Sequence, residues 1–498
     1  MEAREVDVAI IGAGSAGLSA WHAAHKHRES VVLIEGGAFG TTCARVGCMP
    51  SKLLIAAADA AQHARDAGGF GVRTGPVEVD GRAVMARLKH ERDGFVGHVL
   101  ESMKRIDAAD LITGHARFGA PHILIVGDSL RIEARTIVIA TGSRTSWPKQ
   151  FEAAGDRLIV NDDIFEWDTL PESVVVFGPG IIGLEMGQAL HRLGVRVRIF
   201  GKSGSLGSFE DPALKEYADR TFNDELYVDP AAEVEAIERD GEQVVVTFLE
   251  RHTGKRLVER FDYLLAATGR RPNVDRLDLE NAGLALDEDG VPFYNRFTMQ
   301  CRNDNERSDN ERNDKESGSH VFIAGDANQE LPLLHEAITQ GRIAGDNAGR
   351  YPERRAGLRN TPLSIVFTEP QMATVGLRRA VLEQRLGGCD RIAVGEATFD
   401  NQGRATVLRQ NRGLMRLYAE HGSGQFLGGE LFGPQMEHIA HLLAWALEQR
   451  MGVNQMLDMP FYHPVLEEGL RSALRNLSAN LQQGPAIEER CMEHGPGD

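Results

Sequence analysis

Two short apolar runs along the chain each end in a glycine cluster and lead into a segment of small and apolar residues. They cover residues 8–11 and 174–177. Unbroken apolar runs of this length are typical of strands buried on both faces, and the segments that follow have the spacing of helices. A later apolar run in each half, 137–140 and 264–267, ends in Ala-Thr-Gly. The pattern predicts an α/β fold built from two related strand–turn–helix units.

Both glycine clusters have the spacing Gly-x-Gly-x-x-Gly. Such glycines allow a tight turn, close approach of the backbone to a pyrophosphate, and close packing of helix on strand. The helix N-terminus that follows has free N–H groups and favours negative charge. We therefore predict two Rossmann-like dinucleotide sites. Their glycines are Gly12, Gly14 and Gly17 in the first unit, and Gly178, Gly180 and Gly183 in the second.

The next strands of the two units end differently. In the first unit residues 31–34 run into Glu35, a carboxylate placed to accept a hydrogen bond from a ribose hydroxyl. The equivalent residue of the second unit is Gly201, and Lys202 follows it. Loss of the acid and gain of a cation favour a nucleotide with a 2′-phosphate, whereas the plain alternative for Lys202 is a solvated loop lysine. Replacing Gly201 by glutamate is then expected to shift the preference toward NADH.

Cys43 and Cys48 form a close pair after the first unit. In a regular helix, Cα atoms five residues apart are about 8–9 Å from each other, farther than the roughly 7 Å that a disulfide spans. Gly47 and Pro50 predict a break followed by a helix start, which places Cys48 near a helix N-terminus where a thiolate is stabilised. A pair of buried thiols and half of a zinc site are the alternatives. Zinc needs two further ligands close by. The other cysteines are scattered: Cys301, Cys389 and Cys491.

Size and charge narrow the class of protein. A chain of 498 residues is expected to form about three domains. The net charge of -17 argues against a nucleic-acid partner. The N-terminal residues lack the basic and apolar regions of a signal peptide, and no apolar stretch has the length of a membrane-spanning helix. We therefore expect a cytoplasmic enzyme without a membrane partner.

Together these motifs resemble the flavin-dependent pyridine nucleotide–disulfide oxidoreductases, a family that includes dihydrolipoamide dehydrogenase, glutathione reductase and mercuric reductase. The most specific match is Cys-x-x-x-Gly-Cys-x-Pro-Ser-Lys at residues 43–52. The resemblance implies FAD on the first fingerprint, NADPH or NADH on the second, and a redox-active Cys43–Cys48 pair. It also implies that Cys48 faces the flavin and that Cys43 exchanges with a disulfide substrate.

The resemblance assigns further residues. His463 and Glu468 match the family's His-Pro-x-x-x-Glu, so His463 would be the acid–base residue and Glu468 would orient it. A proline after the histidine can open a helix. Lys52 and Glu185 would form an ion pair beside the flavin, although each alone is an ordinary helix charge. Further cofactor-binding positions by the same resemblance are Thr141, Gly142, Asp326 and Gly269.

We expect an FAD-binding domain in two parts, an inserted NAD(P)H domain and a C-terminal α+β dimerisation domain, so the protein would be a homodimer. The polar segment 302–317 has little apolar content and is expected to be a disordered insert in the second FAD part. The expected boundaries are 1–155 and 276–350 for FAD, 156–275 for NAD(P)H, 351–480 for dimerisation and 481–498 for a tail.

Several residues depart from the family pattern and leave the substrate open. Phe461 and Tyr462 precede the histidine where lipoamide dehydrogenases usually have His-Ala. Only Cys491 lies near the C-terminus, where a mercuric reductase would carry a vicinal cysteine pair. The first hypothesis is a dihydrolipoamide-dehydrogenase-like enzyme. The alternatives are an NADPH-dependent reductase of another small disulfide or a metal ion, and a flavin-containing thiol or metal-binding protein without turnover.

Overall fold

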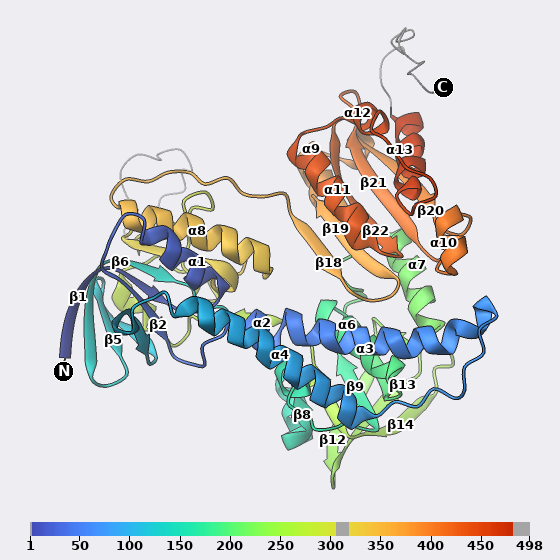
Figure 1. Cartoon of the computed structure of the whole chain (residues 1–498), viewed down its shortest axis with the longest axis horizontal. Helices are drawn as coiled ribbons and strands as arrows, with labels where there is room; N and C mark the ends of the chain where they lie inside the picture. Colours follow the sequence, from blue (N-terminus) through green and yellow to red (C-terminus); the bar gives the residue numbers. More distant parts are fainter. Residues whose placement is uncertain (1, 305–317, 482–498) are drawn as a thin grey trace.

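The computed structural model describes residues 2–304 and 318–481. Residues 305–317 of the predicted insert and the tail with Cys491 lie outside them. Figure 1 shows one sheet at the left, a second sheet at the lower right and a C-terminal sheet above it. Long helices run from the first sheet toward the other two. Within the described ranges, no helix combines the length and apolar character needed to cross a membrane.

The first sheet contains strands from two distant parts of the chain. Its order is β3 (Leu111–Thr113), β2 (Val31–Glu35), β1 (Glu2–Ile11), β6 (Leu130–Ile139), β5 (Ile123–Val126) and β4 (Ala116–Ala120), with β17 (Val321–Ile323) paired to β6. The pairs among β3, β2, β1, β6 and β17 are parallel. Val8, Ala9 and Ile10 are fully buried, which explains the unbroken apolar run.

Two helices cover one face of this sheet and pack closely together, α1 (Ser15–Ala24) and α8 (Leu334–Arg350). A Cβ atom on Gly341 would lie 2.2 Å from the carbonyl oxygen of Ala16, and one on Gly345 would lie 2.1 Å from that of Ala20. Glycines four residues apart on α8 therefore allow the two helix backbones to touch. This packing fixes the helix that follows the first fingerprint.

A pair of long helices links the first sheet to the second. The helices of this segment are α2 (Thr42–Val46), α3 (Cys48–Asp66) and α4 (Gly81–Met103). The side chain of Asp80 accepts a hydrogen bond from the Ala83 N–H and caps α4. Leu54 of α3 and Leu88 of α4 are buried in the same core as Val176 of the second sheet. The start of α3 lies between the first and the second sheet (Figure 1).

The second sheet repeats the parallel arrangement. Its order is β11 (Tyr227–Asp229), β10 (Arg196–Phe200), β9 (Ser173–Phe177), β15 (Tyr263–Ala266) and β8 (Leu158–Ile159), and all pairs are parallel. The helices of this unit are α5 (Asn161–Ile164), α6 (Ile181–Arg192) and α7 (Pro212–Asn223). An antiparallel sheet of β12 (Val234–Asp240), β13 (Gln243–Leu249) and β14 (Arg256–Phe261) packs against it. A short antiparallel pair, β7 (Ser143–Thr145) and β16 (Arg270–Pro272), connects this unit to the first.

The C-terminal unit is an antiparallel sheet covered by helices. Its order is β18 (Leu363–Val366), β19 (Gln371–Gly376), β22 (Phe426–Gly433), β21 (Leu414–Glu420) and β20 (Ile392–Thr398). Its helices are α9 (Arg379–Leu386), α10 (Gly403–Leu408), α11 (Met436–Glu448), α12 (Val453–Leu457) and α13 (Glu468–Asn480). Two parallel α/β units and an α+β unit confirm the predicted fold class. The residue boundaries between domains stay predictions.

Candidate redox site

The first glycine of each fingerprint makes the same turn in both parallel sheets. Gly12 has a φ of 108°, and Gly178 has a φ of 107°. A Cβ atom on Gly12 would lie 2.3 Å from the Ala140 oxygen, and one on Gly178 would lie 2.2 Å from the Ala267 oxygen. Both the backbone angle and the space therefore require glycine. The matching geometry supports the prediction of two related turns.

The other two glycines of each fingerprint have different roles. The third allows close packing, and the middle one leaves open space. A Cβ atom on the third glycine, Gly17 or Gly183, would lie 1.7 or 1.9 Å from the carbonyl oxygen of the first. At the middle glycine, Gly14 or Gly180, such an atom would have no neighbour within 4 Å. The open space lies where α1 or α6 begins, so a phosphate could approach the backbone N–H groups there. Both turns fit a dinucleotide.

Three residues beside the first turn also fit a bound cofactor. The Thr141 hydroxyl oxygen is buried and has no hydrogen-bond partner among the described residues. Gly142, which follows it, has a φ of 69°. Glu35 ends β2 as predicted, and its carboxylate accepts hydrogen bonds of 2.8 Å from the N–H groups of Ala13 and Gly37. A buried hydroxyl without a partner is unusual in a folded protein, so this site fits a ligand with polar atoms.

Asp326 lies three residues after β17, in a short 3-10 helix that follows the strand. Its Oδ2 accepts a hydrogen bond of 2.7 Å from the Ser143 hydroxyl, and the Arg270 Nε donates to that hydroxyl at 2.8 Å. Sequence reasoning missed Ser143 and Arg270. A signal was available, because each directly follows one of the two Ala-Thr-Gly sequences, at Gly142 and Gly269.

The cysteine pair lies at the break between two helices, as predicted. Cys43 belongs to α2 and Cys48 is the first residue of α3. Gly47 between them has non-helical angles, φ -125° and ψ -118°. A Cβ atom on Gly47 would lie 3.2 Å from the Cys43 Cα. The break therefore brings the two cysteines closer than a regular helix would, and it leaves Cys48 at a helix N-terminus.

The two cysteine thiols differ in pKa. A hydrogen bond from Cys43, followed by the charge of Lys52, lowers the pKa of the Cys48 thiol to about 6. The same hydrogen bond and burial raise the pKa of Cys43 well above its ordinary value. In the dithiol form at neutral pH, Cys48 is therefore a thiolate and Cys43 keeps its proton.

Lys52 is itself held by groups from other parts of the chain. Its Nζ lies 2.7 Å from Glu185 Oε2, so the predicted ion pair is present. The other oxygen of Glu185 accepts a hydrogen bond of 2.8 Å from the Phe367 N–H, and the Lys52 Nζ lies 4.6 Å from the centre of the Phe367 ring. Glu185 is 4% exposed. A buried carboxylate in α6 thus fixes a cation one helical turn after Cys48.

His463 lies on the C-terminal unit, at the connection between α12 and α13. Its Nδ1 lies 3.0 Å from Glu468 Oε1, and this contact lowers the pKa of the Glu468 carboxyl. The side chain of His463 is 79% exposed. Pro464 does not open a helix, because α13 begins at Glu468, whose second oxygen accepts from the Val465 N–H. Figure 1 shows the start of α13 well separated from the start of α3.

Close packing requires glycine at position 201, which the sequence did not reveal. A Cβ atom there would lie 2.5 Å from the Pro230 oxygen and 2.7 Å from Pro179 Cγ. Glycine at this position therefore does not by itself indicate a 2′-phosphate. Replacement of Gly201 by glutamate is strained, and this corrects the substitution suggested by the sequence. Lys202, which is exposed, is the better residue to change.

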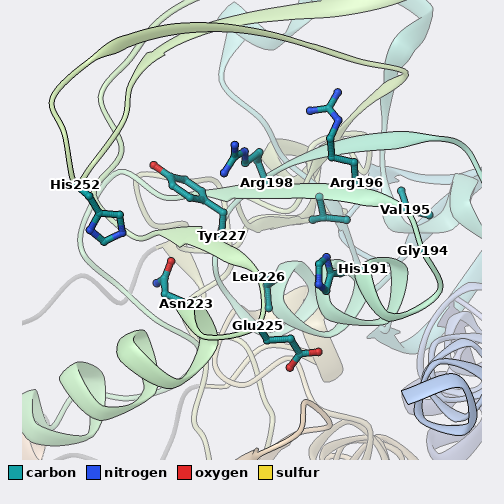
Figure 2. A pocket seen from close by; sticks show the side chains of 11 residues that line it. His191, Gly194, Val195, Arg196, Arg198, Asn223, Glu225, Leu226, Tyr227 and His252 are labelled. Atoms are coloured by element: carbon teal, nitrogen blue, oxygen red, sulfur yellow. The ribbon is translucent and has the colours of Figure 1, made fainter. Parts of the chain in front are cut away.

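A groove on the second unit lies at the opposite end of β10 from the glycine turn (Figure 2). Its charged groups already have partners. Arg196 and Arg198 contact Glu259, and Glu225 contacts Arg192. Across the described ranges, no group of three or more His, Cys, Asp or Glu side chains could hold a metal ion. The glycine turns and the cysteine pair remain the candidate site.

Comparison with known proteins gives matches over nearly the whole chain. The family model "Pyridine nucleotide-disulphide oxidoreductase" matches residues 6–341, and the model of that family's dimerisation domain matches residues 363–474. The chain is 30% identical to dihydrolipoyl dehydrogenase of Haloferax volcanii, over 94% of this chain and 96% of the relative. It is 31% identical to mercuric reductase of Streptomyces lividans, over 95% and 97%.

Two solved structures share the fold of this chain over nearly its whole length. One is LpdA of Mycobacterium tuberculosis, with a TM-score of 0.78 and 23% identity, covering 95% of this chain and 100% of the other. Another is the flavoprotein disulfide reductase RclA of Escherichia coli, with a TM-score of 0.76 and 23% identity over 95% and 99%. At this identity the two structures support the fold alone.

Proposed function

Because this chain belongs to the pyridine nucleotide–disulphide oxidoreductase family, whose members use FAD and NAD(P)H, we propose that it is a dihydrolipoyl-dehydrogenase-like enzyme. It would move electrons between a nicotinamide nucleotide and a small dithiol–disulfide substrate. The observation that carries the proposal is the paired arrangement of Cys43 and Cys48, with a thiolate at the start of α3 beside the Lys52–Glu185 pair.

The residues that would hold the cofactors are those whose geometry fits them. The first fingerprint turn, Glu35, Thr141 and Asp326 would bind FAD, and the second turn with Lys202 and Gly269 would bind the nicotinamide nucleotide. Bound FAD supplies a two-electron carrier between the nucleotide and the cysteine pair. The positive charge of Lys52, fixed by Glu185, favours negative charge at the Cys48 sulfur.

The protein's own groups account for the thiol exchange. Cys43 loses its proton to a base and attacks one sulfur of the substrate disulfide, so that a mixed disulfide forms and one substrate thiolate leaves. The Cys48 thiolate then attacks the Cys43 sulfur, which closes the Cys43–Cys48 disulfide and releases the second substrate thiolate. Two electrons pass from the cysteine pair to the substrate. Its two thiolates take up two protons, one from the base that received the Cys43 proton and one from solvent. Because Cys43 keeps its proton at neutral pH, the exchange needs a base.

His463 with Glu468 is the acid–base pair that we propose, in a homodimer. His463 is exposed. The helix α13, which begins five residues after it, lies well away from the start of α3 of the same chain (Figure 1). We therefore propose that the partner subunit's His463 serves the cysteine pair of this chain. The match to a dimerisation domain at residues 363–474 supports this arrangement.

A mercuric-reductase-like activity is the second candidate, supported by 31% identity over nearly the full length of the Streptomyces lividans enzyme. A steady-state panel separates the two. Lipoamide, glutathione disulfide, thioredoxin, mercuric ion and a quinone would each be tested with NADH and with NADPH. The proposal expects the highest kcat/KM with lipoamide. A higher value with mercuric ion would favour the second candidate, and absence of any NAD(P)H oxidation would favour a thiol-binding protein without turnover.

The nucleotide preference gives a prediction of its own. We expect a higher kcat/KM for NADPH than for NADH, and replacement of Lys202 by glutamate is expected to lower the value for NADPH about tenfold, because a cation opposite a phosphate becomes an anion. The value for NADH should change less than twofold. Steady-state kinetics at low salt measure both, since screening weakens exposed charge pairs. Lys255→Glu, an exposed lysine in the turn between β13 and β14, is the control. A higher kcat/KM for NADH in the unmodified protein contradicts the prediction.

A further inference from the structure

The connection between β10 and α7, residues 201–211, rests against the second glycine turn. It begins directly after Phe200, the last residue of β10. In dinucleotide-binding folds, residues at this strand end contact the ribose 2′ position. The Gly207 N–H donates a hydrogen bond of 2.7 Å to the carbonyl oxygen of Pro179, which lies inside the fingerprint. Movement of this connection would therefore disturb the turn that is proposed to receive the pyrophosphate.

The other side of this loop packs on the dimerisation domain. Leu206 and Phe209 are 1% and 3% exposed, and they belong to the same core as Met372 and Phe432 of the C-terminal sheet. The ring of Phe209 meets that of Phe432 edge to face, with 6.1 Å between their centres. The loop thus lies between the fingerprint turn of its own domain and the sheet of another.

A fully buried carboxylate of that sheet holds the end of the loop. Glu430 of β22 is 0% exposed. Its Oε2 accepts hydrogen bonds from the N–H groups of Glu210 at 2.8 Å and Asp211 at 3.1 Å. Its Oε1 lies 3.1 Å from the Tyr418 hydroxyl. Burial of a carboxylate is unfavourable unless donors satisfy it, and the loop backbone supplies two of the three donors here.

The residue at the end of the loop is fixed from the same direction. Asp211 caps α7 through a hydrogen bond from the Ala213 N–H to its Oδ1. Its Oδ2 contacts Arg379 of α9 at 3.1 Å and Arg416 of β21 at 3.2 Å. Figure 1 shows α7 beside the lower end of the C-terminal sheet. The dimerisation domain therefore fixes both the backbone and the side chain where the loop joins α7.

We propose that Glu430 is a positioning residue for the nicotinamide nucleotide. From the dimerisation domain it fixes residues 201–211, so that Lys202 and the Pro179 turn are already in place when the nucleotide binds. This inference rests on the proposed assignment of the second fingerprint to NAD(P)H. It gives the dimerisation domain a second role, within one chain, besides pairing two subunits.

Variants of Glu430 in the full-length FAD-loaded protein test the inference. Glu430→Ala removes the acceptor of two backbone N–H groups and is expected to raise the Kd for NADP⁺ and the KM for NADPH about tenfold, because the loop loses its anchor. The KM for the disulfide and kcat should stay within about twofold, since the cysteine pair is untouched. Glu430→Asp withdraws the same acceptor by one methylene and should weaken the nucleotide in the same direction.

Glu430→Gln is the rescue variant. Its amide oxygen can accept from both N–H groups and its NH₂ can donate to Tyr418, so near-normal nucleotide affinity is expected. Glu396→Gln, which removes the negative charge of another partner of Arg416 without touching the loop, is the matched control. Calorimetric titration with NADP⁺ reports binding even if no tested substrate is turned over, so failure of the proposed function remains distinguishable from failure of this inference.

The variants also define the results that would overturn the inference. Unchanged NADP⁺ affinity in both Glu430→Ala and Glu430→Asp would show that the loop needs no anchor. If Glu430→Ala does not fold, Glu430→Asp alone decides. If Glu430→Gln and Glu430→Asp lower NADP⁺ affinity equally, nucleotide binding requires the charge of Glu430. The hydrogen bonds that position the loop would then not be what the nucleotide requires. Faster backbone hydrogen exchange over residues 202–211 in Glu430→Asp, with Glu430→Gln unchanged, is the expected accompanying result.

Discussion

Replacement of Cys48 by serine is expected to lower NAD(P)H-dependent disulfide reduction by more than about a thousandfold while FAD stays bound, because thiol exchange needs a second sulfur to resolve the mixed disulfide. Cys43→Ser should have the same effect, since it removes the sulfur that attacks the substrate. Turnover of the disulfide and the flavin absorbance of the purified variants are the two measurements. FAD should remain because the fingerprint turn, Glu35 and Thr141 are unchanged.

The exposed thiol of Cys389 provides the control. Cys389→Ser should retain normal turnover, because this residue lies on the C-terminal unit and has no part in the exchange. Near-normal disulfide reduction in Cys43→Ser or Cys48→Ser would reject the mechanism. Loss of flavin in either variant would instead show that the cysteines are needed to hold the cofactor.

The pH dependence of the same pair follows from the lowered pKa of Cys48. In the reduced protein, alkylation of Cys48 should rise as the pH increases through about 6, because the thiolate forms there and the thiolate is the nucleophile. Above that pH the rate should level off, whereas an ordinary thiol would still be gaining reactivity. Peptide mapping after brief treatment with iodoacetamide measures the rate. Lys52→Met should move the rise to higher pH, because the neighbouring positive charge is lost.

Replacement of His463 by glutamine is the second large effect. It is expected to slow disulfide turnover by about a hundredfold or more, the usual effect of removing a positioned acid–base group. Bleaching of the flavin absorbance by NAD(P)H should survive, because that half-reaction needs no thiol exchange. Stopped-flow measurement of the two half-reactions separates them. His252→Gln, in the turn between β13 and β14, is a control that should leave both half-reactions unchanged.

Subunit mixing tests whether the site is shared. In a mixed dimer of Cys48→Ser and His463→Gln chains, shared sites would leave one complete site and one with both lesions. Each mixed dimer should then have about half of the wild-type rate, as expected for two equivalent sites related by twofold symmetry. If each chain catalysed alone, neither site of the mixed dimer would be complete. Mixed dimers no more active than the parent dimers would therefore reject the shared site.

Sequence alone was sufficient for features whose cause is local. The fingerprint spacing predicted both turns, because the φ of Gly12 and the missing space for a Cβ atom are properties of a few adjacent residues. The break at Gly47 was likewise predicted from helix geometry and from two residues. Gly201 shows the limit of such reasoning. Its glycine was read as a mark of nucleotide preference, whereas contacts with Pro230 and Pro179 account for it.

Only the tertiary structure decided which distant groups meet. Ser143 meets both Asp326 and Arg270 because β17 pairs with β6 and β7 pairs with β16, pairings that no local pattern encodes. The anchor of loop 201–211 by Glu430 depends on how the C-terminal sheet docks against the second unit. Hydrogen-bonding geometry and side-chain periodicity act over a few residues, so the sequence alone predicts their effects. Contacts between units depend on burial summed over whole faces, and they are determined only when those faces pack.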